Sequence, residues 1–118
     1  MNRPTHPAVA SLQLNLLPDK LAEYGRQMLA DVEACKLAFS RSKLAVDPAF
    51  AIAYLDSAKA SLNAAIQAQD WLGACLTVSG IDDAKSTLEA QEAKYRAAGY
   101  YTVANRREAA LILREGIL

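Results

Sequence analysis

Residues 47–80 read DPAFAIAYLDSAKASLNAAIQAQDWLGACLTVSG, and this stretch holds the clearest helix of the chain. Asp47 can accept hydrogen bonds from the unpaired amides of a first helical turn. Pro48 suits the first helical position, because the N–H that proline lacks would have no partner there. Apolar side chains then recur at steps of three and four residues, which places them on one helical face. They are Ala51, Tyr54, Leu55, Ala58, Leu62, Ala65 and Ile66. This face is rich in alanine, so a neighbouring helix can approach it closely.

The end of this helix allows two interpretations. Either the helix continues to about Val78, or the chain turns within residues 67–70 and forms a short second helix. Gly73 weakens a continuous helix by roughly 1 kcal/mol relative to alanine. Gln69 also places a polar side chain on the apolar face. We therefore expect the turn.

A long amphipathic helix precedes the central one and is expected from Pro18 to about Leu44. Its apolar stripe consists of Leu21, Tyr24, Met28, Val32, Cys35 and Phe39. The link at residues 45–46 is short, so this helix should fold back antiparallel on the central helix. Its wide stripe also offers a seam for a homodimer.

Two shorter helices are expected after Gly80. Asp82 and Asp83 place negative charge at the positive dipole end of a helix that begins near Ala84. Gly99 suits the position just past the end of that helix. Thr102 can then cap a final helix.

Composition supports a single helical domain. A chain of 118 residues is short enough for one domain, and its 53% of hydrophobic residues are mostly alanine and leucine, with only two phenylalanines. We therefore predict an all-α fold over residues 18–118, an antiparallel bundle or stacked helical hairpins of four to five helices. Residues 1–17 should form a partly disordered N-terminal arm. The alternating Leu12–Leu16 segment of this arm either lies extended across the bundle or offers a strand edge to another chain.

The charge and the ends of the chain bear on its partners and compartment. The 13 basic and 13 acidic residues balance, which argues against binding to nucleic acid or anionic lipid by bulk electrostatics. No apolar run approaches the roughly 18 residues of a membrane span, and the proline-interrupted N-terminus is a poor signal peptide. Cys35 and Cys75 are expected in the core rather than in a disulfide or metal site. The expected compartment is the cytoplasm.

The sequence offers little for catalysis. His6 is the only imidazole and lies in the N-terminal arm, so any histidine-dependent mechanism would have to use it. No CxxC or HxxxH motif is present. The acidic residues Asp82, Asp83, Glu89 and Glu92 are better explained by helix capping and solubility than by a cation site. The scattered glycines form no phosphate loop. We therefore expect no enzyme activity, no metal and no cofactor.

By elimination, the sequence predicts a non-catalytic protein–protein interaction module, such as an adaptor, a chaperone-like subunit or an inhibitor of a larger complex. It would act by occlusion or bridging on another protein. Trp71, Tyr100 and Tyr101 could form its contact surface if both predicted turns lie at the same end of the bundle. Alternatively, these aromatic residues simply close the end of the helical core.

The alternative function is a small helix-turn-helix DNA-binding protein that uses the last helix. Residues 93–107 read AKYRAAGYYTVANRR, a helix, a glycine turn and a second helix start. Asn105, Arg106 and Arg107 could then face a major groove. The turn is short for this motif, and the chain lacks the basic excess that phosphate contacts require, which makes nucleic acid the less favoured partner.

Overall fold

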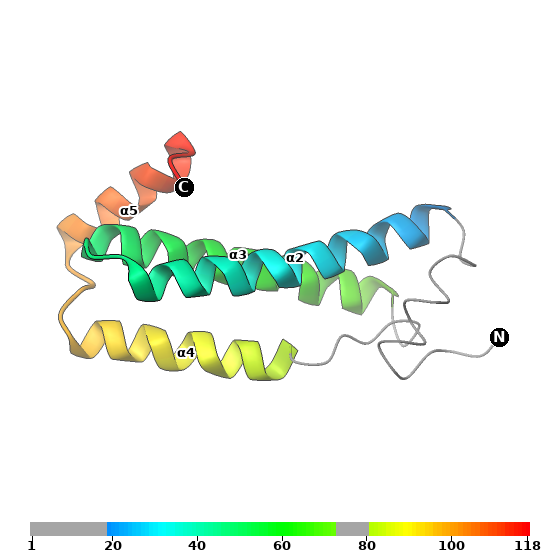
Figure 1. Cartoon of the computed structure of the whole chain (residues 1–118), viewed down its shortest axis with the longest axis horizontal. Coiled ribbons are helices and arrows are strands. Elements are labelled where there is room, and N and C mark those ends of the chain that lie inside the picture. Colours follow the sequence, from blue (N-terminus) through cyan, green and yellow to red (C-terminus); the bar gives the residue numbers. More distant parts are fainter. Residues whose placement is uncertain (1–18, 73–80) are drawn as a thin grey trace.

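The computed structural model describes residues 19–72 and 81–118, which fold into four helices with no strand among them. They are α2 (Asp19–Leu44), α3 (Pro48–Leu72), α4 (Ile81–Ala97) and α5 (Val103–Glu115) (Figure 1). The predicted all-α fold is confirmed. The expected N-terminal arm with its Leu12–Leu16 segment lies outside the described residues, as do Cys75 and Val78.

α2 and α3 form the expected antiparallel hairpin (Figure 1). Asp47 starts α3 as the sequence predicts: its Oδ1 accepts a hydrogen bond from the Ala49 N–H at 2.9 Å, and its carbonyl accepts one from the Ala51 N–H at 3.0 Å. Pro48 occupies the first helical position. Because the link between the two helices is only three residues long, α3 has to return along α2.

α3 continues through residues 67–70, so the turn predicted there is wrong. Its 25 residues form a rod of roughly 38 Å. Alanine and glutamine, which fill this part of the helix, are good helix formers. Ala65 is fully buried and Ile66 packs against the core, so this end of α3 is held by tertiary contacts. One polar residue at the end of an apolar stripe is therefore not enough to break the helix.

The core consists of two clusters that lie on different sides of α3. The first cluster packs α3 against α2 and α4, and its buried members are Cys35, Ala38, Ala51, Leu55, Ala58, Leu62, Leu88 and Tyr95. The second packs α3 against α5, with Ala49, Ile52, Ala53, Ala109 and Ile112 buried. Cys35 is a free buried thiol, as expected for a core residue, and burial raises its pKa.

α4 and α5 meet α3 in different ways. α4 runs antiparallel to α3, whereas α5 rises away at an angle, so the last helix does not complete an up-and-down bundle (Figure 1). α4 also begins at Ile81, three residues earlier than expected, which places Asp82 and Asp83 inside its first turn. That position still favours negative charge.

The loop between α4 and α5, residues 98–102, is fixed at both ends. Gly99 has a φ of 81°, and the N–H groups of Gly99 and Tyr100 donate to the carbonyls of Arg96 and Tyr95 at 3.1 and 3.0 Å. This is the Schellman arrangement, and its usual apolar contact is a stacked pair of Tyr95 and Tyr100 rings with centroids 5.0 Å apart. Thr102 then caps α5. The loop therefore sets the direction in which α5 leaves.

A buried hydroxyl connects α4 to the end of α2. The Tyr95 hydroxyl donates to the Ser42 carbonyl at 2.7 Å, so the 3.1 Å contact with Ser42 Oγ has the serine as donor. The Ser42 carbonyl is one of the last four of α2, which have no partner within the helix. Ser42 is 1% exposed, so without Tyr95 this carbonyl would be buried and unpaired.

We predict that Tyr95→Phe destabilises the fold by about 1–3 kcal/mol, because it leaves the buried Ser42 carbonyl without a donor. Chemical denaturation followed by circular dichroism would measure this free energy of unfolding. Ser42→Ala provides the control, since it keeps the Tyr95–carbonyl bond and should cost less. An unchanged stability of Tyr95→Phe would contradict the assignment.

Candidate functional site

A cleft of about 580 Å³ opens between α3, α4 and the start of α5. Its lining residues are Ile52, Asp56 and Lys59 from α3, Glu92 and Arg96 from α4, and Tyr101, Val103, Arg106 and Arg107 from the loop and α5. Four of these side chains are basic and two are acidic, although the whole chain is neutral. The cleft therefore brings together charged side chains that come from three different helices.

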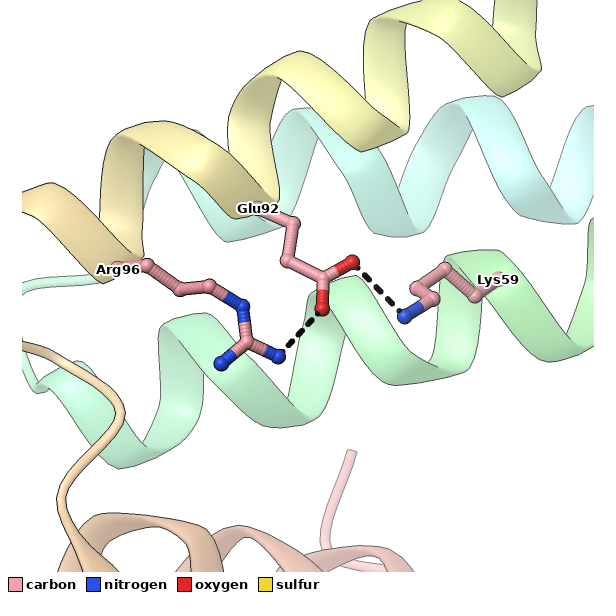
Figure 2. Close-up of polar contacts among 3 residues, drawn as sticks. All are labelled: Lys59, Glu92 and Arg96. Atoms are coloured by element: carbon pink, nitrogen blue, oxygen red, sulfur yellow. Dashed lines mark hydrogen bonds and ion pairs between the residues drawn. The ribbon is translucent and has the colours of Figure 1, made fainter.

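Glu92 is the centre of an ion-pair network on one wall of the cleft (Figure 2). One of its carboxylate oxygens accepts from Arg96 at 2.8 Å and the other accepts from Lys59 at 3.0 Å. These hydrogen bonds, first that of Arg96 and then that of Lys59, lower the pKa of Glu92. The Arg96 contact joins residues four positions apart on α4, and the Lys59 contact ties α4 to α3.

Tyr101 extends this network into the loop. The Arg96 guanidinium lies 4.2 Å from the centroid of the Tyr101 ring, a cation–π contact. The Tyr101 hydroxyl oxygen is buried and has no hydrogen-bond partner within residues 19–72 and 81–118. Burial, together with the nearby negative charges of Glu92 and Asp56, raises the pKa of Tyr101 to about 12. The hydroxyl therefore keeps its proton at neutral pH.

Asp56 lies on the side of α3 that faces α5. It follows Ala49, Ile52 and Ala53 at helical spacing, and these three are buried against α5. Its carboxylate makes no hydrogen bond or ion pair with the described part of the chain. Burial raises the pKa of Asp56, opposed by the positive charge of Lys59. A half-buried acid without a direct partner is a common feature of binding sites.

The structure does not bring the three predicted contact aromatics together. Tyr100 and Tyr101 lie in the loop and pack against both core clusters, near the start of α3. Trp71 belongs to the last turn of α3, at the opposite end of the rod from that loop (Figure 1). The backbone therefore places Trp71 at one end of α3 and the two tyrosines near the other end.

The three predicted DNA-contact residues have different environments. The Asn105 side chain donates to the Tyr100 carbonyl at 2.9 Å, and its backbone N–H donates to Thr102 Oγ1 at 3.0 Å, so this residue is engaged in the loop. Arg106 and Arg107 are exposed and line the cleft.

Sequence reasoning missed most of the cleft. Asp56 and Lys59 are not members of the apolar stripe that the sequence predicts for this helix, and no local pattern suggests a role for either residue. The spacing of Asp56 from Ala49, Ile52 and Ala53 was a usable signal. However, only the packing of α5 reveals that this second side of α3 is buried.

The part of the chain that the structure describes also bears on metal binding and membrane insertion. No cluster there has three or more His, Cys, Asp or Glu side chains placed to hold a metal ion. None of its four helices combines the length and the apolar character needed to cross a membrane. In comparisons with known proteins, no protein-family profile, curated protein or solved structure matched the chain significantly.

We predict that Glu92→Gln lowers the free energy of unfolding at neutral pH by up to about 1 kcal/mol, because Lys59 and Arg96 lose their shared carboxylate. The folded-state pKa of Glu92 is lowered, so its contribution is present above the unfolded-state pKa. It disappears as the pH falls through the folded-state pKa, and the two stability curves should converge there. Denaturant titrations across this pH range would measure the difference.

Glu33→Gln is the matched control, because it removes another carboxylate–lysine pair. The side chains of Glu33 and Lys36 are 74% and 66% exposed and lie 3.4 Å apart, whereas that of Glu92 is 21% exposed. The control should change stability very little. If both substitutions lowered the free energy of unfolding equally, the Lys59–Glu92–Arg96 network would contribute no more stability than an exposed ion pair.

Asp56→Asn should change the free energy of unfolding in the opposite direction to Glu92→Gln. The folded-state pKa of Asp56 is raised, so its charge disfavours folding at neutral pH, and the variant should be at least as stable as the parent protein there. As the pH falls through the folded-state pKa, the parent should regain stability relative to the variant. Asp82→Asn, an exposed acid in the first turn of α4, serves as control and should lose a few tenths of a kcal/mol. A clear loss of stability on Asp56→Asn would contradict this assignment.

Proposed function

We propose that the chain is a non-catalytic protein-interaction module that binds a segment of another protein in the cleft between α3, α4 and α5. The observation that carries this proposal is the cleft itself, which combines a buried hydroxyl donor on Tyr101 with exposed arginines and apolar surface. Val103, at its edge, is 72% exposed. Binding sites commonly place a few polar groups around apolar surface in this way.

The way the cleft is held also supports binding. The Lys59–Glu92–Arg96 network and the stacked Tyr95–Tyr100 pair hold α4 and the loop before any partner arrives. A surface that is already ordered loses less conformational entropy on association. Such a module would act by occlusion or bridging, as an adaptor, a chaperone-like subunit or an inhibitor of a larger complex. We place it in the cytoplasm, in keeping with the free thiol of Cys35.

The DNA-binding alternative has less support. Asn105 is engaged by the loop, and Arg106 and Arg107 line a concave surface, whereas a recognition helix has to project into a groove. Asp56 and Glu92 lie in the same cleft and would repel a phosphate backbone. Arg106 and Arg107 remain the residues that this alternative would use.

Site-specific photo-crosslinking tests the proposal. A photoreactive residue at Val103, on the cleft edge, should form a discrete protein adduct in native lysate, with and without nuclease treatment. The same residue at Leu37, 52% exposed on α2 and outside the cleft lining, should not form this adduct. Tyr101→Ala should reduce the Val103 adduct. Trp71→Ala should leave it unchanged, because Trp71 lies at the other end of α3.

Two results would overturn the proposal. An adduct at Val103 that consists of nucleic acid, or that disappears after nuclease treatment, would favour the DNA-binding alternative. Equal protein adducts at Val103 and Leu37, or none at either position, would mean that the cleft does not select a protein partner.

A further inference from the structure

The polar groups of the cleft divide into those that are already paired and those that are not. Lys59 and Arg96 both donate to Glu92. Arg106 and Arg107 form no ion pair with the described residues. Positive charge that is available to a ligand therefore lies on the wall made by α5.

The two neighbouring arginines suit a carboxylate. A guanidinium presents a planar fork of N–H donors that matches the two oxygens of a carboxylate, and such charged hydrogen bonds are stronger than neutral ones. Tyr101 lines the same cleft, and its buried hydroxyl has no hydrogen-bond partner in the described chain. Together these groups favour an acceptor-rich ligand on the α5 side.

Asp56 restricts what can bind. Its half-buried carboxylate lies on α3 and would repel a second negative charge placed against that helix. A ligand with continuous negative charge, such as a phosphate backbone, would meet this repulsion. A peptide can place one carboxylate towards α5 and an apolar side chain over Ile52 and Val103. Like-charge contacts of this kind give specificity by penalising the wrong ligand.

We propose that the cleft recognises an acidic segment of its protein partner, with a carboxylate held by Arg106 and Arg107 and an adjacent apolar side chain packed over Ile52 and Val103. This inference rests on the proposed function, because it names the chemistry of the partner segment for that same cleft. Tyr101 borders the bound segment, and the charge of Asp56 confines the carboxylate of that segment to the α5 side.

The test uses short capped peptides that alternate Glu with Leu and Ala, and the same peptides with Gln or Lys in place of Glu. Binding to the full chain is followed by backbone NMR shifts. The Glu peptide should shift the Tyr101, Val103 and Arg107 amides, and the Gln peptide should bind about tenfold more weakly or worse. The affinity for the Glu peptide should also fall as salt is added.

Substitutions in the cleft make this test more specific, because they should change binding of the Glu peptide in opposite directions. Combined Arg106→Gln and Arg107→Gln should abolish the preference for Glu over Gln peptides. Arg114→Gln makes the same change in the last turn of α5, outside the cleft lining, and should leave binding unchanged. Asp56→Asn should tighten binding of the Glu peptide severalfold, since it removes a repulsive charge while keeping the side-chain shape. Circular dichroism confirms that each variant is folded.

Several outcomes would overturn the inference. They are equal or tighter binding of the Gln or Lys peptide, shifts confined to surfaces outside the cleft, and displacement of the Glu peptide from the cleft by duplex DNA. If Val103 still crosslinks to a protein while the Glu peptide shows no advantage, the proposed function stands and the acidic partner is wrong. If the Glu peptide binds the cleft but no protein crosslinks at Val103, the proposed function fails while the carboxylate chemistry of the cleft remains.

Discussion

The fold depends on the close approach of other helices to α3. Ala49 and Ala53 are fully buried against α5, and Ala51 and Ala58 are buried against α2 and α4. Alanine contributes little apolar area, but it lets helix backbones come close together, and it has the highest helix propensity of all residues. A helix with alanine on two of its faces can thus pack closely against three other helices. A larger residue at these positions would force the neighbours apart.

Two sets of polar contacts then fix the positions of the packed helices. The Tyr95 hydroxyl satisfies a buried carbonyl at the end of α2, and the same residue, as part of the Schellman turn, stacks on Tyr100. Nearby, Glu92 connects Lys59 to Arg96, which lies over the Tyr101 ring. Both sets act on the loop that directs α5. The cleft therefore has its shape because α4 and the loop are held by directional contacts rather than by apolar burial alone.

Two side chains of the cleft are at least partly buried without a hydrogen-bond partner among the described residues. Burial raises the pKa of both Asp56 and Tyr101, and neither side chain has a hydrogen-bond partner in the described residues. Groups that lose hydration without gaining a partner cost folding free energy. Proteins tend to keep such groups where a ligand can satisfy them. That physical argument, together with the charge of Arg106 and Arg107, links the architecture to the proposed binding role.

The helices and most of their ends follow from local sequence. Asp47, Gly99 and Thr102 act through their own backbone neighbours, so their roles follow from local chemistry, and the short 45–47 link requires a hairpin. The length of α3 and the cleft depend on tertiary packing. Packing of Ala65 and Ile66 against the core keeps α3 helical where the polar Gln69 suggested a turn. The second buried side of α3 exists because α5 packs on it. The cleft joins residues up to 55 positions apart, from Ile52 to Arg107, and no local pattern encodes a contact that exists only between packed helices.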